Sequence, residues 1–215
     1  MMTRRDALAL IGSAVAATTL FRNWPAFAQN VAPQDLALPG PLGDVAQGPA
    51  DAKVTIIEYA SLTCSHCAAF HADTYPLLKQ RYIDTGQVRY ILREFPLDPL
   101  ATAGFMLARC DGEAKYYPIV DLLFAQQKTW AFSDKPVDTL QQLMRQAGFS
   151  QEKFEGCLRD QKVYDAVNAV RNRAAKDFSV SSTPTFFING HKLPAGVTPA
   201  NYIDALIDLE LKRAK

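Results

Sequence analysis

The chain has 215 residues, with 23 basic and 22 acidic side chains and a formal net charge of +1 at pH 7. This length is enough to bury one sizeable hydrophobic core. No internal repeat is visible, and outside the N-terminus no second long apolar run marks a membrane span or a separate domain.

Residues 1–28 have the pattern of a bacterial export signal. The paired Arg4 and Arg5 precede an apolar run of mostly small residues at 7–20, and residues 26–28 (Ala-Phe-Ala) offer a cleavage site of small-x-small form. The apolar run is short for a membrane span, which favours a removable signal peptide over an anchor. The twin arginines fit the Tat route, and Sec signals also contain arginines, so both routes stay open. We expect a periplasmic protein.

Removal of this signal leaves 20 basic and 21 acidic residues, a net charge of −1. That balance argues against nucleic acid as a partner. Residues 29–50 are rich in Pro, Gly, Ala and Gln. We expect them to form an extended N-terminal arm that leads into the fold.

The sequence Cys64-Ser65-His66-Cys67 stands between a predicted strand and a predicted helix. Residues 54–60 before it are apolar and β-rich, and the residues after it keep a helical apolar face. A helix N-terminus offers unpaired N–H groups and a positive dipole end, which stabilise a thiolate, so Cys64 is the expected nucleophile. His66 can add positive charge or a hydrogen bond to that thiolate.

Two other interpretations of this motif exist. A structural disulfide would not explain the position at a helix start, and a zinc site would normally show a second Cys/His pair at matching spacing. His71, four residues after Cys67, could still complete a three-ligand metal cluster with His66. Reversible thiol chemistry is favoured over both.

The remaining pattern places strands at both ends of a long helical stretch. Residues 88–95 predict a second strand, parallel to the first because a helix connects them. Residues 185–188 and 191–193 flank Asn189-Gly190, the dipeptide best suited to a type I′ hairpin turn. A last helix should begin at Thr198-Pro199, and its apolar face consists of Tyr202, Ile203, Leu206 and Ile207.

Residues 98–177 predict several amphipathic helices. One helical face of apolar core residues ends at Gly148, a natural C-cap, and consists of Val137, Leu140, Leu143, Met144 and Ala147. The aromatic residues Trp130 and Phe132 are expected in the core, although exposed aromatics there would line a client groove.

These motifs, in this order, resemble a known family. A βαβ unit with Cys-x-x-Cys and a ββα unit opened by Thr183-Pro184 resemble the thioredoxin fold. Residues 98–177 resemble the helical insertion of the DsbA family of periplasmic thiol:disulfide oxidoreductases, and the strongest local matches are 58–67 and 180–190. The resemblance implies an α/β protein in which 51–97 and 178–215 form a thioredoxin-like domain and 98–177 an inserted helical domain.

The resemblance also assigns roles to residues. Cys64 resembles the exposed attacking cysteine and Cys67 the buried resolving one. Pro184 resembles the cis-proline that faces the active site, where the exposed backbone of Thr183 would pair with an extended substrate segment. Glu58 matches the family's buried acid, which would accept the proton of Cys67; an ordinary acid at a strand end is the alternative.

Two residues depart from the family pattern. Many members have Pro where this chain has Ser65, and many strong oxidases have an apolar residue where it has Thr183, which also occurs before the cis-proline of related isomerases. The Thr183 hydroxyl would either contact a cysteine sulfur and tune it, or be a β-branched strand residue with no such role.

The implied function is disulfide donation to reduced, unfolded exported proteins by thiol-disulfide exchange. No cofactor is expected besides the redox-active Cys64-Cys67 disulfide, because no phosphate loop or nicotinamide or flavin motif is present. The resemblance implies a DsbB-like membrane quinone reductase as reoxidising partner, and we expect a monomer. The alternatives are a disulfide isomerase or reductase on the same fold, a periplasmic copper chaperone, and a non-catalytic folding chaperone.

Cys110 and Cys157 lie in the helical stretch, outside the motif. An exported protein in an oxidising compartment rarely leaves two thiols free, so we expect them to bond to each other as a structural disulfide. Two separately buried thiols are the alternative.

Overall fold

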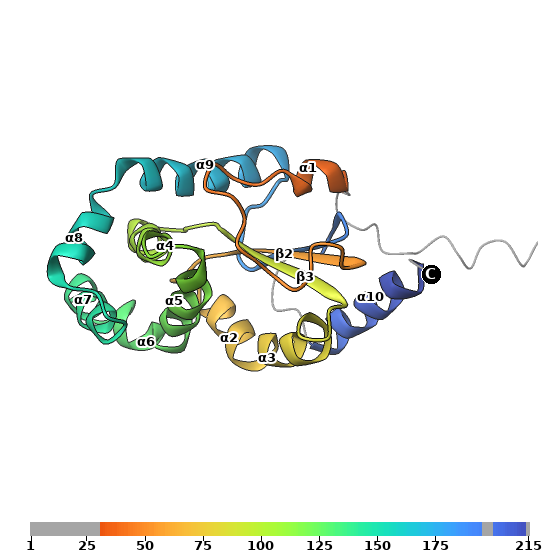
Figure 1. Ribbon diagram of the computed structural model, residues 1–215, viewed down its shortest axis with the longest axis horizontal. Coiled ribbons are helices and arrows are strands. Elements are labelled where there is room, and N and C mark those ends of the chain that lie inside the picture. The colour runs from red at the N-terminus through yellow and green to blue at the C-terminus, as the bar shows by residue number, and fades with distance from the viewer. Residues whose placement is uncertain (1–30, 195–199, 214–215) are drawn as a thin grey trace, which may run out of the picture.

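A mixed five-stranded sheet lies at the centre of the molecule. The computed structural model describes residues 31–194 and 200–213 (Figure 1). The strands follow the order β1-β3-β2-β4-β5 across the sheet, and β2 and β3 are parallel while the other neighbours are antiparallel. Their bounds are Ala46–Gln47 for β1, Val54–Ala60 for β2, Val88–Glu94 for β3, Thr185–Ile188 for β4 and His191–Lys192 for β5.

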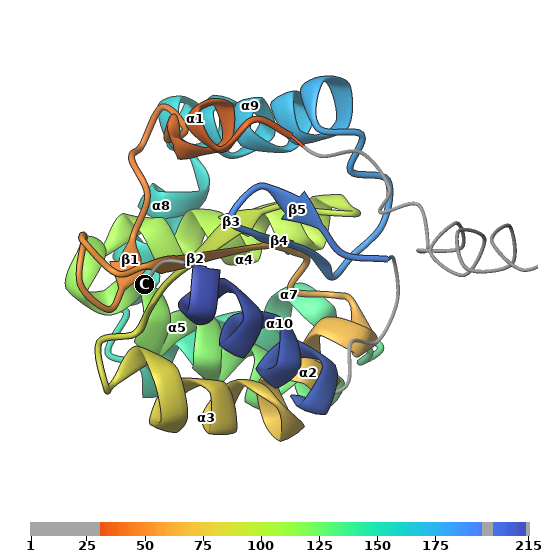
Figure 2. The ribbon, with the colours of Figure 1, turned by 90° about the vertical axis from the view of Figure 1, so that its right-hand side faces the viewer.

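Helices cover both faces of this sheet, as Figure 2 shows. One face carries the helices that follow β2 and the last helix: α2 (Ser65–Asp73), α3 (Tyr75–Leu78), the π-helical turn η1 (Lys79–Ile83) and α10 (Ala200–Arg213). The opposite face carries α1 (Pro33–Ala37) and α9 (Gln161–Asp177). The result is a three-layer α/β arrangement, the thioredoxin fold that the sequence predicts.

Strand β2 is buried on both faces, and its two faces belong to different parts of the core. Ile56 and Ala60 contribute to the larger cluster, on the side of α2, while Ile57 and Tyr59 pack in a second cluster with residues of α9. Successive side chains of a strand point to opposite faces. Glu58 therefore points to the same side as Ile56, toward the helix that begins at the cysteine motif.

The remaining helices gather at one end of the sheet (Figure 1). They are α4 (Pro99–Cys110), α5 (Glu113–Ala125), α6 (Gln127–Trp130), α7 (Pro136–Gln146) and α8 (Gln151–Leu158). Helix α9 then returns over the sheet, where Val170 and Ala174 share a core cluster with Ile91. The stretch expected as a helical insertion thus ends in a helix that covers the sheet itself.

Two residues of this region that were expected in the core lie outside it. Val137 is 57% exposed and Phe132 is 61% exposed, contrary to the expected core positions. Val137 lies in the first turn of α7, which begins at Pro136. The buried face of this helix starts one turn later, with Leu140 and Met144. Trp130 is fully buried, and its indole N–H donates to the carbonyl of Leu123 at 2.8 Å.

The N-terminal arm is not simply extended. Residues 33–37 form helix α1, and β1 pairs with β3 as an edge strand of the sheet. The buried guanidinium of Arg93 explains this order, because it donates to the carbonyl of Leu36 at 2.7 Å and pairs with Asp44 at 2.7 Å. A charge that is buried must be paired and hydrogen-bonded, and the arm supplies both partners.

The predicted hairpin turn is confirmed. Asn189 and Gly190 both have positive φ, 46° and 88°, as a type I′ turn requires. The carbonyl of Gly190 also accepts a hydrogen bond from Val31 N at 3.1 Å, which ties the arm to the hairpin. Thr198-Pro199 lies outside the described residues; on α10, Ile203 and Ile207 are buried and Tyr202 is 37% exposed.

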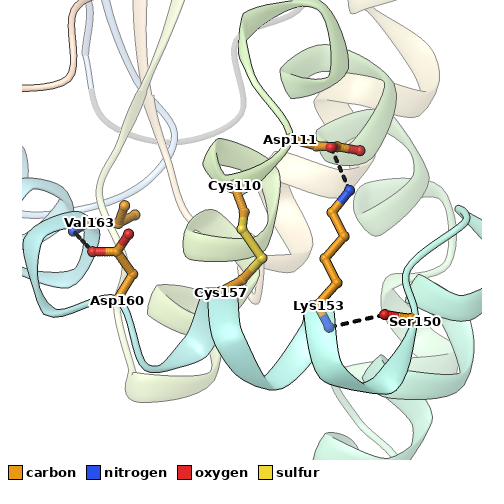
Figure 3. The surroundings of a disulfide bond; sticks show 7 residues. All are labelled: Cys110, Asp111, Ser150, Lys153, Cys157, Asp160 and Val163. Atoms are coloured by element: carbon orange, nitrogen blue, oxygen red, sulfur yellow. Dashed lines mark hydrogen bonds and ion pairs between the residues drawn. A yellow bond between two sulfur atoms is a disulfide. The ribbon is translucent and has the colours of Figure 1, made fainter.

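A disulfide joins Cys110, at the end of α4, to Cys157 on α8 (Figure 3). It closes a 47-residue separation with a Cα–Cα distance of 5.7 Å. Helix α8 starts beside it, where the Ser150 side chain accepts from Lys153 N at 3.1 Å. In the residues that the structure covers, no helix is long and apolar enough to cross a membrane.

Candidate active site

The cysteine motif occupies the start of α2. Strand β2 ends at Ala60, a short turn follows, and Cys64 takes the N-cap position of α2 with φ −81° and ψ 118°. Ser65 and His66 are exposed, Cys64 is partly exposed and Cys67 is fully buried. The two thiols are not bonded to each other, so the structure describes the dithiol form.

The pKa of the Cys64 thiol is lowered from 9.0 to about 5. The largest cause is a hydrogen bond with the Cys67 thiol. The Thr183 side chain and the backbone N–H groups of Cys67 and His66 lower the pKa further, whereas burial raises it. These N–H groups belong to the first turn of α2, where they have no partner inside the helix. His66 therefore contributes through its backbone. Cys64 is a thiolate at neutral pH.

Cys67 has the opposite properties. Its pKa is raised well above the usual value, first by burial and then by the hydrogen bond with Cys64 and the negative charge of Glu58. A buried thiol resists ionisation because the charged form loses its hydration. The two cysteines are thus unequal: one is exposed and anionic, the other enclosed and protonated.

Thr183 and Pro184 lie directly against Cys64. Their peptide bond is cis, and the Cys64 thiol lies 3.3 Å from the carbonyl oxygen of Thr183, to which it donates when protonated. The Thr183 hydroxyl is buried and makes no hydrogen bond within the described part of the chain, yet it lowers the pKa of Cys64. A buried hydroxyl beside a thiolate can donate a hydrogen bond to the sulfur.

Glu58 is completely buried, on the face of β2 that packs against α2 and Cys67. Its Oε2 accepts from the hydroxyl of Tyr90 and lies 3.1 Å from Nε2 of His71. The other oxygen, Oε1, has no partner among the described residues. His71, which the sequence allowed as a metal ligand together with His66, is instead buried against Glu58, while His66 is exposed. The described ranges hold no group of three or more His, Cys, Asp or Glu placed to bind a metal ion.

Gln127 is a residue of this site that the sequence did not single out. It is the first residue of α6, is buried, and its amide donates to the carbonyls of Leu62 at 2.8 Å and Cys64 at 2.9 Å. These bonds fix the loop that presents Cys64. Gln127 is 63 residues from Cys64, so no local pattern indicates the contact. The sequence pattern also did not indicate Tyr90 or Asp121 as site residues. The alternation of side chains along β3 places Tyr90 on the same side as Val88 and Leu92.

Fold and site together define the class of thioredoxin-fold proteins that carry a Cys-x-x-Cys pair next to a cis-proline. The family model described as thioredoxin matches residues 42–208. The crystal structure of alpha-DsbA1 from Wolbachia pipientis superposes with a TM-score of 0.77 and 30% identity, over 86% of this chain and 98% of that chain. The chain belongs to the thioredoxin family, in its DsbA group.

Other relatives agree in fold and in name. A protein of Rickettsia bellii named a protein-disulfide oxidoreductase is 34% identical over 177 residues, which are 80% of this chain and 66% of that protein. A protein-disulfide isomerase from Novosphingobium aromaticivorans has a TM-score of 0.71 at 19% identity, over 80% of this chain and 99% of that chain, which shows the fold alone. The chain spans 54% to 66% of the length of the Rickettsia relatives that it matches.

Proposed function

We propose that this protein is a thiol:disulfide oxidoreductase that donates disulfides to reduced proteins exported to the periplasm. The inequality of the two cysteines carries the proposal. The pKa of Cys64 is about 5, so the reduced protein gains a stable thiolate that the oxidised protein lacks. Stabilising the dithiol form makes the disulfide form the stronger oxidant.

The reaction proceeds by two exchanges. A client thiolate attacks Sγ of Cys64 in the Cys64–Cys67 disulfide, a mixed disulfide forms, and Cys67 leaves with the electron pair of the broken bond. The second client thiolate then attacks the client sulfur of the mixed disulfide, and Cys64 leaves as a thiolate. The client is oxidised by two electrons and this protein is reduced by two. The low pKa of Cys64 makes it the better leaving group in the second exchange.

The cis peptide at Thr183-Pro184 gives the client a place to lie. The carbonyl of Thr183 reaches to 3.3 Å from the Cys64 sulfur. The backbone of Thr183 suits an extended client segment, which would pair with the main chain and not with particular side chains. This mode of binding suits many different clients.

Location and partners extend the same proposal. Residues 1–28 act as a cleaved export signal by the Tat or Sec route, and the protein works as a periplasmic monomer. Its dithiol form is reoxidised by a DsbB-like membrane quinone reductase, which accepts the two electrons. The support for these points is the N-terminal sequence pattern and the likeness to DsbA proteins.

The test is a pair of assays on one reduced client and one scrambled client, together with the equilibrium of the protein with glutathione. We expect rapid oxidation of the reduced client by the oxidised protein, no activity in the Cys64→Ser variant, and a redox equilibrium that favours the dithiol. The cysteines of the Cys110–Cys157 disulfide serve as a matched control, since their double alanine variant should keep client oxidation. A strongly reducing equilibrium without client oxidation would refute the proposal.

A disulfide isomerase is the second candidate. Thr183 favours it, because a polar residue at this position also occurs before the cis-proline of isomerases, and one structure of the same fold is named a protein-disulfide isomerase. If the protein reshuffles the disulfides of the scrambled client faster than it oxidises the reduced client, the result would support the isomerase.

A further inference from the structure

Three side chains form a line from the buried side of the active site to the surface. Glu58 of β2 lies 3.1 Å from Nε2 of His71 on α2, and Nδ1 of His71 lies 4.0 Å from Oδ1 of Asp121 on α5. The exposed fraction of the side chain rises along this line, from 0% for Glu58 through 3% for His71 to 50% for Asp121.

Two buried side-chain atoms of the Glu58–His71 pair, Oε1 of Glu58 and Nδ1 of His71, have no hydrogen-bond partner among the described residues. The Thr183 hydroxyl is a third such atom, at the other side of the site. An ionised Glu58 only accepts, so His71 must donate from Nε2, which leaves Nδ1 as a bare acceptor that faces Asp121. Such a pair can receive a proton at Nδ1 and pass the Nε2 proton to Oε2 of Glu58, whose carboxyl group then turns to present the proton on the side of Oε1. Buried polar atoms are rarely left unpaired without a role.

A hollow lies beside His71. It has a volume of about 330 Å³ and is lined by residues of α2, α3, η1 and α5, including His71, Asp121 and Phe124. The His71 ring stacks on Phe124 with ring centroids 4.2 Å apart. His71 lies seven residues, or about two turns, along α2 from Cys64.

The proposed reaction requires a proton on this side. When the Cys64–Cys67 disulfide is reduced, a client dithiol loses two protons. One proton goes to the medium because Cys64 stays a thiolate, and the other must reach Cys67, whose sulfur has no exposed surface. The negative charge of Glu58 acts on Cys67, so the carboxyl group lies close enough to affect its ionisation.

We propose that His71 and Asp121 form a proton relay that connects Glu58, and through it the sulfur of Cys67, to solvent at the hollow between α2 and α5. In the reducing direction a proton passes from Asp121 to Nδ1 of His71 through a solvent molecule that bridges the 4.0 Å between them, the Nε2 proton of His71 passes to Glu58, and Glu58 protonates the departing Cys67 thiolate. Reoxidation reverses each transfer. No electron moves along the relay. The inference rests on the proposed disulfide exchange and adds the path of its proton.

The surroundings of His71 suit a relay. Burial raises the pKa of Asp121, so its carboxyl group takes up a proton more readily than an exposed one. The Tyr90 hydroxyl holds Oε2 of Glu58 on the side of His71. The titratable groups around His71 are Glu58 on β2, Tyr90 on β3, Tyr75 on α3, Lys79 on η1, Tyr117 and Asp121 on α5, and Cys67 on its own helix.

The test compares the His71→Gln and Asp121→Asn variants with wild type. The glutamine amide keeps a donor for Glu58 but cannot pass a proton, and Asp121 is at the surface, so its variant should fold. Oxidised protein is mixed with reduced glutathione at pH values between 5 and 9, and the reaction is quenched with acid. Free thiols are then alkylated, and mass spectrometry measures how fast the Cys67 thiol is released. Glu113→Gln, which removes a carboxylate from the same helix, is the matched control.

We expect release of Cys67 to slow by about a hundredfold in His71→Gln, the lower end of the range for lost general acid catalysis, and severalfold in Asp121→Asn. The loss of rate relative to wild type should grow as the pH rises, because the proton concentration in solvent falls. The equilibrium constant with glutathione should change less than twofold, and Glu113→Gln should release Cys67 at the wild-type rate. Imidazole should restore part of the rate in His71→Ala, since the hollow gives it access.

Other results overturn the relay. Wild-type rates in Asp121→Asn at every pH would exclude Asp121 as the entry point, even if His71→Gln failed to fold. A rate deficit that is independent of pH, or one matched by an equal change in the glutathione equilibrium, would show a structural or electrostatic role instead. If the wild-type protein itself exchanged no disulfide with glutathione, the proposed thiol-disulfide exchange would be refuted, and the relay with it.

Discussion

The thiolate of Cys64 should make the stability of the reduced protein depend on pH. The pKa of this thiol falls from 9.0 to about 5 on folding. A group with a lowered folded-state pKa stabilises the fold fully above its unfolded pKa, and this contribution disappears as the pH falls through the folded pKa. The stabilisation is therefore complete above pH 9, partial at pH 7 and absent below pH 5.

The magnitude at pH 7 follows from the two pH units that separate pH 7 from the folded-state pKa of about 5. At 1.36 kcal/mol per unit the upper bound is about 2.7 kcal/mol, and since Cys64 is half exposed, solvent screening reduces it to about 1 to 2 kcal/mol. Urea denaturation under a non-thiol reductant at pH 7 and pH 4 measures this term. Subtracting the same difference for reduced Cys64→Ser, which lacks the thiolate, removes all other titrations. A difference of zero after this subtraction would refute the assignment of Cys64 as a folded-state thiolate.

Three further substitutions test parts of the fold that position the site. Replacing Cys110 and Cys157 by alanine should lower the free energy of unfolding of the oxidised protein by about 2 to 4 kcal/mol, read from urea midpoints, because the unfolded chain regains its freedom. Gln127→Leu should cost about 1 to 3 kcal/mol in the same measurement, since two carbonyls of the active-site loop lose their donor. Arg93→Met should cost about 3 to 5 kcal/mol and expose the N-terminal arm to limited proteolysis, because Asp44 stays buried without its partner; unchanged cleavage would contradict this anchor.

Local patterns in the sequence predicted the parts of the site that depend on neighbours in the chain. The thiol at a strand-to-helix junction and the Asn189-Gly190 turn both involve residues only a few positions apart, and the structure has each of them. These features require no knowledge of how distant segments meet. The expected position of Glu58 rested on its match to the family's buried acid, and the structure places it on the face of β2 that faces α2.

Contacts between distant segments were missed or misjudged. The arm looked extended because its composition is typical of loops, whereas the buried charge of Arg93, about 50 residues away, fixes its shape. His71 looked available for a metal because its partners lie on β2 and α5, which the sequence does not place against α2. Its position four residues after Cys67, on the same face of the helix, does indicate that it turns inward with that cysteine.

The disulfide between α4 and α8 has a consequence for how the protein is made. A newly exported chain contains Cys110 and Cys157 as thiols, and these must lose two electrons before the helices are joined as in Figure 3. Under the proposed function, oxidised copies already in the periplasm hold the disulfide that a new copy needs. Each finished molecule would then speed the maturation of the next, so that the supply of this protein grows autocatalytically from the first copies that an outside oxidant completes.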